Sequence, residues 1–404
     1  MKLRRIIFWL HLVAGVFAGI VVFIMSITGV ALTYQKQMTE WADRAYWPAT
    51  PSTSATRVTH LPVAKLIAKA EQAQPEARPT AITFYSDPSA PAVVTAPPGQ
   101  NVFVDRYTGA TVLAGSTVMR RFFRLATDWH RYLGATGDGR PSGKAITGAC
   151  NVAFLFIVIS GIYLWWPRSW AFQSVRSVTW FKKGLNGRAR DFNWHNVFGF
   201  WSAIPLFFVV LSATVISYPW ASRMVYRIAG SPEPVRNNAQ QRGAGNTQPN
   251  ATLDLHQIDA LLASAEVHAP GWRTINLRLP TTSDRQVTFA VDKSFGGRPQ
   301  MRSTLVFDKT TGEIVRSQTF NDQTAGERAR SWMRFVHTGE FYGVAGQTIA
   351  GIASAAGAML VFTGLALAVR RLLAWNARRS RGCLTVPAGD AVGAVNESGR
   401  MRIL

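Results

Sequence analysis

The feature that most constrains the fold is a set of four apolar segments, each long enough to cross a lipid bilayer. They occupy residues 6–34, 145–166, 195–218 and 345–369, and none contains Asp, Glu, Lys or Arg. A helix of about 20 mostly apolar residues spans the hydrocarbon core. Of the 404 residues, 48% are hydrophobic and only 16% are charged, and the charges lie mainly between these segments. We therefore predict an α-helical membrane protein with four transmembrane helices.

The first segment resembles a secretory signal peptide, because the basic stretch MKLRR precedes it. Its apolar run is much longer than the roughly 7–15 residues of such peptides. It also contains His11. We interpret it as a retained transmembrane helix.

The basic residues indicate how the helices are oriented. They cluster before the first segment, between the second and third, and after the fourth. The clusters are Lys2, Arg4 and Arg5; Arg168, Arg176, Lys182, Lys183, Arg188 and Arg190; and Arg370, Arg371, Arg378, Arg379 and Arg381. With four spans, all three places lie on one side, which the positive-inside rule makes cytoplasmic. We expect a bacterial inner-membrane protein with cytoplasmic termini. Its net charge of +22 fits anchoring and lipid contact, and no nucleic-acid motif accompanies it.

The two long loops, about 35–144 and 219–344, are then periplasmic, and each is predicted to fold as a small α+β module. Residues 61–73 have helical spacing and are followed by the strand-like runs AITFY, AVVTA and NVFVD. Residues 253–266 are followed in the same way by TINLRL, VTFAV and STLVFD. Each module ends on an Asp-x-x-Thr-Gly turn, at residues 105–109 and 308–312. We interpret these turns as structural hairpins.

The chain also contains an internal duplication. The two Asp-x-x-Thr-Gly turns are 203 residues apart, and so are ISGIYL and FTGLAL. The first and third apolar segments match at an offset of 184, which pairs His11 with His195 and Gly15 with Gly199. Each half reads as helix, module, helix, and both halves start on the same side, so the repeats are parallel.

The seven histidines divide into two groups. His60, His256 and His268 lie in the predicted modules and fit ordinary surface positions. The other four stand near the start of a span or of the short segment that leads into it. They pair between the halves, His11 with His195 and His130 with His337. The topology puts the first pair near the cytoplasmic face and the second pair near the outer face.

Ionisable groups in a membrane span are usually paired or functional. A proton relay would normally include a carboxylate, and the predicted spans contain none. A non-haem metal site normally has more than two protein ligands, and the two cysteines, Cys150 and Cys383, form no cluster. Bis-imidazole ligation of haem needs only two histidines on facing helices and an apolar slot. We therefore expect two b-type haems.

Glycines follow two of the proposed ligands by one helical turn. Gly15 comes four residues after His11, and Gly199 four residues after His195, so each lies on the same helix face as its histidine. A missing side chain there lets a porphyrin approach the backbone. Helix packing without haem is the alternative role for these glycines.

Together these motifs resemble PepSY-associated transmembrane proteins. The resemblance rests on the His-x-x-x-Gly opening of the first span, on SGIYLWWPR, on HTGEFYG and on the paired Asp-x-x-Thr-Gly turns, and it covers residues 1–375. The family includes inner-membrane ferric-siderophore reductases. The resemblance implies four spans, periplasmic PepSY modules and haem b. Its iron ligands would fall on His11, His130, His195 and His337.

With the resemblance, the chain divides into nine predicted regions. They are transmembrane helix 1 (1–34), periplasmic PepSY-like module 1 (35–119), an interfacial segment (120–144), transmembrane helix 2 (145–166), a cytoplasmic basic loop (167–191), transmembrane helix 3 (192–219), periplasmic PepSY-like module 2 (220–330), an interfacial segment with transmembrane helix 4 (331–371) and a cytoplasmic tail (372–404).

The leading functional hypothesis is an oxidoreductase that conducts electrons across the membrane. Electrons would enter at the inner haem and leave from the outer haem to a periplasmic acceptor, for which ferric siderophore iron is the candidate. No nucleotide-binding motif is present, so the donor would be a quinol or a separate reductase. Basic residues flank the outer histidines and could attract an anionic ferric complex or lipid headgroups. They are Arg120, Arg121, Arg124, Arg131, Arg328, Arg330 and Arg334.

Two other functions remain open at this point. One is a haem-free PepSY protein that binds or restrains a periplasmic protease. The other is a cytochrome subunit of a flavoprotein reductase. The sequence assigns no catalytic residue beyond the proposed haem ligands.

Overall fold

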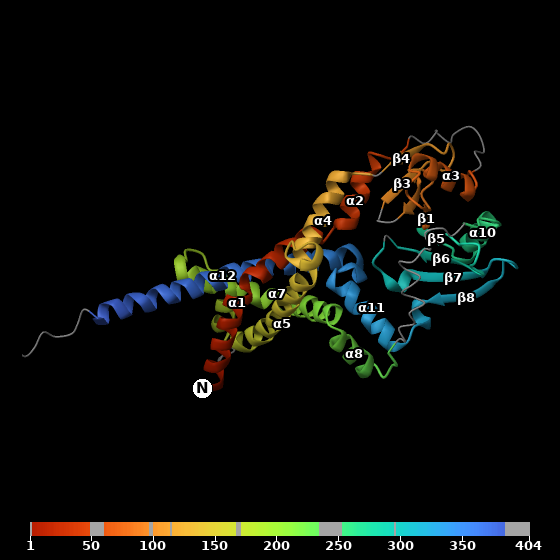
Figure 1. The fold of residues 1–404 in the computed structure, drawn as a ribbon. Helices are drawn as coiled ribbons and strands as arrows, with labels where there is room; N and C mark the ends of the chain where they lie inside the picture. The colour runs from red at the N-terminus through yellow and green to blue at the C-terminus, as the bar shows by residue number, and fades with distance from the viewer. Residues whose placement is uncertain are drawn as a thin grey trace, which may run out of the picture.

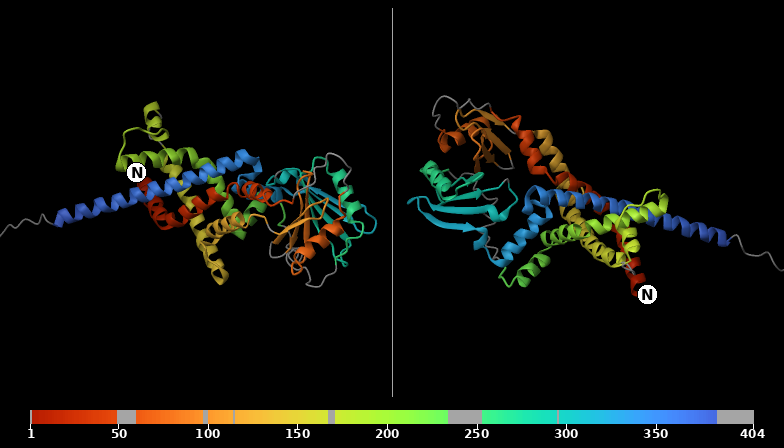
Figure 2. Two further views of the ribbon diagram at one scale, coloured as in Figure 1. Left: turned by 90° about the horizontal axis from the view of Figure 1, so that it is seen from above. Right: turned by 180° about the vertical axis from the view of Figure 1, so that it is seen from behind.

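The computed structural model describes residues 2–48, 60–96, 100–113, 115–166, 171–233, 253–294 and 296–383. Helices form a bundle at one end of the molecule and a sheet lies at the other end (Figures 1 and 2). Arg168, residues 234–252 and the tail beyond residue 383 lie outside the described residues.

Four long helices make up the bundle. They are α1 (Lys2–Leu32), α5 (Arg140–Trp165), α7 (Gly187–Ser217) and α12 (Gly343–Cys383). Each is long and apolar enough to cross a membrane. Large apolar side chains such as Phe17, which is 83% exposed, and Ile204, which is 71% exposed, lie on their surfaces. Such surfaces suit contact with lipid, and the chain is a multi-pass membrane protein.

The two halves of the chain interlock in this bundle. Helix α1 packs against α5 and α12, and α7 packs against the same two helices. A shared core joins Val22 of α1, Phe154 of α5, Leu206 of α7 and Ala353 of α12. The buried amide of Asn151 on α5 also donates to the Val210 carbonyl of α7 at 3.1 Å. The bundle is therefore a single packed unit.

Helix α7 extends beyond the predicted third span. It begins at Gly187 rather than near residue 192, so Asp191 lies on this helix and not in a loop. This carboxylate is 1% exposed and accepts from Arg190 at 2.9 Å and from Arg370 at 3.1 Å. The ion pair compensates a buried charge, which would be strongly destabilising if left unpaired. It also ties α7 to α12.

Shorter helices surround the ends of the long ones. Helix α4 leads into α5 and α11 leads into α12, while α2 and α8 continue from α1 and α7. The remaining helical segments connect these elements or the strands. Their bounds are α2 (Gln35–Arg44), α4 (Thr117–Tyr132), η1 (Gly137–Gly139), α6 (Phe172–Thr179), α8 (Pro219–Ile228), η2 (Pro299–Met301), η3 (Phe320–Asp322), α11 (Ala325–His337) and η4 (Glu340–Tyr342).

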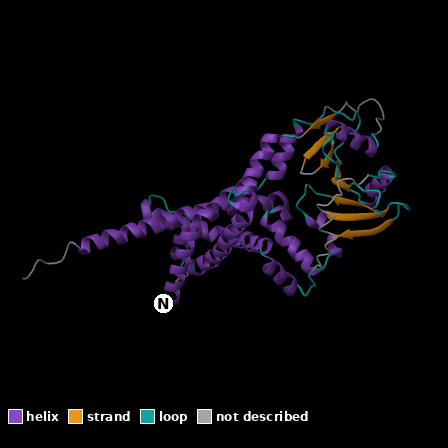
Figure 3. Ribbon diagram, viewed as in Figure 1, coloured by secondary structure: helices purple, strands orange, loops and turns teal. Residues whose placement is uncertain are grey.

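The extramembrane part is one antiparallel sheet of eight strands in the order β4-β3-β2-β1-β5-β6-β7-β8 (Figure 3). The strands are β1 (Ala81–Tyr85), β2 (Ala92–Ala96), β3 (Gln100–Val104), β4 (Thr111–Leu113), β5 (Thr274–Arg278), β6 (Gln286–Asp292), β7 (Arg302–Asp308) and β8 (Ile314–Thr319). Two helices, α3 (Val63–Ala73) and α10 (Ile258–His268), pack on it in one shared hydrophobic core.

The sequence predicted two modules, and the structure joins them through the β1–β5 pair. Thr83 lies opposite Asn276 in this pair, and the Asn276 amide donates to the Thr83 hydroxyl at 2.8 Å. An unpaired strand edge exposes backbone polar groups, and the joint removes one such edge from each half. The predicted turns are confirmed as structural: Asp105 and Asp308 each accept backbone N–H groups of the turn that follows.

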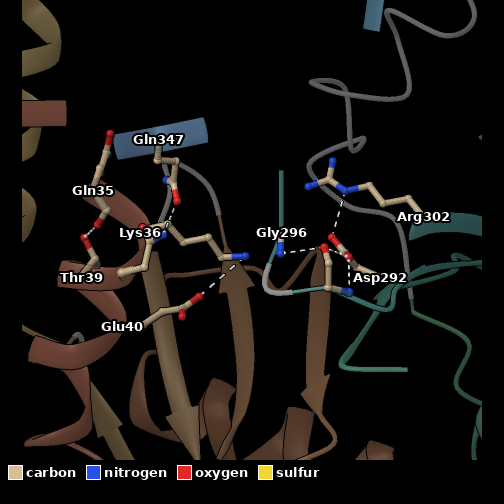
Figure 4. A network of polar contacts seen from close by, with 10 residues as sticks. Gln35, Lys36, Thr39, Glu40, Asp292, Gly296, Arg302 and Gln347 are labelled. Atoms are coloured by element: carbon tan, nitrogen blue, oxygen red, sulfur yellow. Dashed lines mark hydrogen bonds and ion pairs between the residues drawn. The ribbon is translucent and has the colours of Figure 1, made fainter. Parts of the chain in front are cut away.

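Helix α2 lies between the bundle and the loop that joins β6 to β7 (Figure 4). Gln37 of α2 donates to Gln347 of α12 at 2.6 Å, and Gln347 donates to the Thr33 carbonyl at 2.9 Å. The Lys36 side chain lies against Gly296 in the loop between β6 and β7, where an added Cβ would collide with its ammonium group. Helix α2 therefore contacts both parts.

Asp43 of α2 forms the most enclosed ion pair in this region. It is 6% exposed, and Arg120 of α4 binds it through two nitrogens at 2.7 and 2.6 Å. The Ser116 N–H donates to the same carboxylate at 2.9 Å. These bonds fix the start of α4, the helix that ends near His130.

We expect Asp43→Ala to lower the free energy of unfolding by about 2 kcal/mol, because Arg120 and the Ser116 N–H lose a charged acceptor. Glu40→Ala on the same helix is the control. Its pair with Lys36 is 41% exposed on both sides and is worth less than about 0.5 kcal/mol. Denaturant unfolding of the solubilised protein measures both, and equal losses would contradict the assignment.

Candidate functional site

The first histidine pair, His11 and His195, lines a cavity between the long helices. His11 of α1 and His195 of α7 both line this space, which has a volume of about 1850 Å³. All four long helices contribute to its wall. Gly15 and Gly199, singled out in the sequence, line it as well. A Cβ added at Gly15 would meet no atom within 4 Å, so this wall is open.

Each of these two imidazoles is held by a hydroxyl from another helix. His11 Nδ1 lies 2.8 Å from the Ser160 hydroxyl of α5, and His195 Nδ1 lies 3.0 Å from the Thr363 hydroxyl of α12. Both hydroxyls direct their hydrogen to a carbonyl four residues earlier in their own helix, at 2.7 Å. The oxygen is then left to accept from the ring, which assigns the ring proton to Nδ1. The lone pair of Nε2 is left available as a ligand.

The second pair lies at the ends of α4 and α11, outside the four candidate spans. The rings of His130 and His337 face each other with centroids 6.2 Å apart and planes tilted by 51°. His130 Nδ1 lies 3.0 Å from the Thr28 hydroxyl, and His337 Nδ1 lies 3.0 Å from the Val209 carbonyl. Metal–imidazole bonds of about 2 Å would set two such ring centres roughly 6 Å apart.

Burial keeps these two rings uncharged. It lowers the pKa of His130 to about 4, with a smaller contribution from the neighbouring His337. Burial likewise lowers the pKa of His337. Neutral imidazole is the form that binds metals.

The sequence analysis missed the groups that orient the rings. Ser160 and Thr363 are 203 residues apart, the spacing of the duplicated turns, and each precedes a glycine. A Cβ on Gly161 or Gly364 would lie 3.4 Å from the nearest ring carbon of His11 or His195. The sequence signal for these ring-orienting groups was the dipeptide Ser-Gly in ISGIYL and its counterpart Thr-Gly in FTGLAL.

The outer pair departs from full symmetry. The counterpart of Thr28 at the offset of 184 is Ser212, whose hydroxyl donates to the Val209 carbonyl at 2.8 Å. His337 contacts that carbonyl rather than the hydroxyl. The second half thus uses a backbone acceptor where the first half uses a side chain.

Other predicted residues lie away from these sites or are already engaged. The ring of His60 stacks on Tyr107 at 4.7 Å, and His268 Nδ1 contacts the Ser264 carbonyl at 2.8 Å. Among the arginines near the outer pair, Arg120 is paired with Asp43. The guanidinium of Arg330 donates to Ser222 at 2.6 Å.

The site chemistry is that of paired imidazoles. In the part of the chain that the structure describes, no three His, Cys, Asp or Glu side chains come together as a metal-binding group. Two neutral imidazoles would instead be enough to hold a metal ion that is carried by a planar macrocycle.

Fold and site together define a multi-pass membrane protein that buries paired histidines between its helices. A model of the PepSY-associated TM region matches residues 8–371, nearly the whole chain. The chain therefore belongs to the family of PepSY-associated transmembrane proteins, which confirms the resemblance found in the sequence. No curated protein matches it.

The open space at Gly15 gives a prediction about stability. In the protein free of any bound cofactor, we expect Gly15→Ala to leave the unfolding temperature unchanged or to raise it, because alanine favours helix and its methyl group meets no neighbour. Gly143→Ala is the matched variant in another span. Its Cβ would collide with the Tyr132 carbonyl, so its unfolding temperature should fall. Thermal unfolding in one detergent ranks the two, and a lower value for Gly15→Ala would show that the space is filled.

Proposed function

We propose that this protein is an inner-membrane haem b protein that moves electrons across the membrane and reduces a periplasmic acceptor, with siderophore-bound Fe(III) as that acceptor. The observation that carries the proposal is the hydrogen bonding of the four histidines. Each has its Nδ1 engaged by a group on another helix. This arrangement favours Nε2 as the free ligand atom at every ring.

The residues fit two haem groups. His11 and His195 would hold one in the cavity, where the open wall at Gly15 gives room for a flat ring. His130 and His337 would hold the other, and the distance between their rings suits one metal ion between them. Haem iron supplies reversible one-electron Fe(III)/Fe(II) chemistry. Two centres suit a hydrocarbon core about 30 Å thick.

The distribution of charge supports the orientation. Arg190 and Arg370 meet at Asp191, and the next residue, Arg371, contacts Phe8 and Trp9 near the start of α1. The positive-inside rule makes this end cytoplasmic. The sheet would then be periplasmic and would contain one PepSY-like module from each of the two parallel repeats. The same strand order on both sides of β1–β5 favours this division.

The reaction transfers one electron at a time. The His11–His195 pair would hold the haem group that receives electrons from a quinol or a separate reductase, and the His130–His337 pair would hold the group nearer the periplasmic acceptor. Each electron converts one siderophore-bound Fe(III) to Fe(II), which hard oxygen ligands bind less tightly. The exposed Arg121 and Arg124 on α4 lie near the outer pair in sequence and would attract an anionic ferric complex.

The direct test is anaerobic mixing of the reduced protein with ferric siderophores while the haem absorbance is followed. We expect reoxidation of the haem and appearance of Fe(II). A colourless purified protein would instead support a haem-free protein that restrains a protease. A coloured protein that no ferric chelate reoxidises would support a cytochrome subunit.

We expect His195→Ala to remove about half of the reduced haem absorbance, because one of two bis-imidazole sites loses a ligand. His11→Ala should remove the same half, and the double variant should lose no more. His268→Ala is the control, since this ring is exposed and its hydrogen bonds within the described residues go to Ser264 of its own helix. Additive losses from His11 and His195 would show that the two do not share an iron.

Thr363→Val tests the orienting hydroxyl. An acceptor on Nδ1–H makes the imidazole a stronger donor and stabilises Fe(III). Its removal should therefore raise the midpoint potential of the inner haem, by roughly 40 mV for each kcal/mol of hydrogen-bond energy lost. Thr179→Val is the control, because among the described residues that hydroxyl binds a carbonyl of its own helix, at 2.9 Å, and no histidine. Redox titration of both variants measures the shift, and an unchanged or lower potential would refute the role.

A further inference from the structure

The cavity around His11 and His195 is strongly asymmetric in charge. Its deep wall is apolar and includes Phe154, Leu206 and Val22. None of the described residues that line it is acidic. Five basic residues also line it: Lys2, Arg4, Arg5, Arg188 and Arg371. Four of them lie at the starts of α1 and α7, and Arg371 contacts Phe8 near the start of α1; we call this end of the cavity its mouth.

The arginines keep a fixed distance from the imidazoles. Arg4 precedes His11 by seven residues, and Arg188 precedes His195 by seven residues. Seven residues correspond to two helical turns, or about 10 Å. On α12, Gly364 lies against the His195 ring, and Arg371 comes seven residues after Gly364. The cationic groups thus border one end of the cavity, about two turns from the ring nitrogens.

Two of these arginines have no polar partner. Arg4 donates to the Leu164 carbonyl at 2.6 Å. Within the described parts of the chain, Arg188 has no hydrogen bond or ion pair, and the guanidinium of Arg371 contacts only aromatic rings. Those rings are Phe8 at 5.1 Å and Trp9 at 4.7 Å. The neighbouring Arg370, in contrast, is paired with Asp191.

We propose that Arg188 and Arg371 form a carboxylate-binding subsite at the mouth of this cavity. The ligand it fits is a flat apolar body with two carboxylates at one edge, so that the body enters the apolar part and the carboxylates stay at the basic mouth. An arginine fork matches a carboxylate in shape and charge. The inference rests on the proposed function, since haem b has this form with its two propionates. It adds that the propionates of the inner haem point toward the cytoplasm.

The experiment compares haem b with its dimethyl ester, which has the same ring but no carboxylates. Both are titrated into apoprotein in nanodiscs of zwitterionic lipid. The full chain carries His337→Ala, so that only the inner site binds. The test protein adds Arg188→Gln and Arg371→Gln. The control adds Arg379→Gln, because Arg379 stacks on Trp375 at 5.5 Å and does not line the cavity.

We expect the parent protein and the control to bind haem more tightly than the ester. The double variant should bind haem roughly tenfold more weakly, as expected for two solvent-exposed charged contacts, and should bind the ester unchanged. Equal binding of haem and ester by the parent would overturn the subsite and leave the haem proposal intact. Failure of the parent to bind either compound would refute both.

An anionic lipid could supply the same negative charge. A second titration in nanodiscs with phosphatidylglycerol distinguishes this source. Preference for haem over the ester should persist there if the arginines bind propionates. Loss of the preference, with phosphatidylglycerol retained by the parent and not by the double variant, would assign the arginines to lipid phosphate and overturn the inference.

Discussion

The structure depends on how imidazole N–H groups are satisfied at part-buried positions between helices. A buried polar group without a partner costs free energy, and in a bilayer the partner must come from the protein. Here every bundle histidine reaches across to a different helix for its Nδ1 acceptor. The same bond that removes this cost orients the ring and leaves Nε2 free. Stability and ligand geometry therefore have one physical origin.

The extramembrane sheet places a second constraint on the bundle. Strands β1 and β5 belong to different halves of the chain and pair along their whole length. Helix α2 then contacts both the β6–β7 loop and α12, through Lys36 and Gln37. The outer histidines lie on α4 and α11, which follow the two halves of the sheet in sequence. A shared sheet thus limits how far α4 and α11 can separate, and with them His130 and His337.

Four long apolar helices were predictable because a span depends on local length and composition. The histidine pairs were inferred from a detectable duplication, and the structure places His130 next to His337 and lines one cavity with His11 and His195. It did not predict the roles of Ser160 and Thr363. A hydroxyl in an apolar helix usually binds its own helix, and only the packed neighbour shows that its oxygen also accepts from a ring. The joint sheet was missed because β1 and β5 come from distant segments. Asp191 was assigned to a loop because helix ends are poorly marked in sequence.

Helices α7 and α12 carry three successive layers of the inner site. His195 contacts Thr363, Asp191 contacts Arg370, and Arg188 lines the mouth with Arg371. Along α7 these layers are about one turn apart. Because a helix is rigid over two turns, the buried ion pair of Asp191 fixes the axial register of the layers on either side of it. The Asp191 carboxylate takes no part in the proposed electron transfer. Its ion pair nevertheless determines whether the His195 imidazole and the basic mouth face the same cavity.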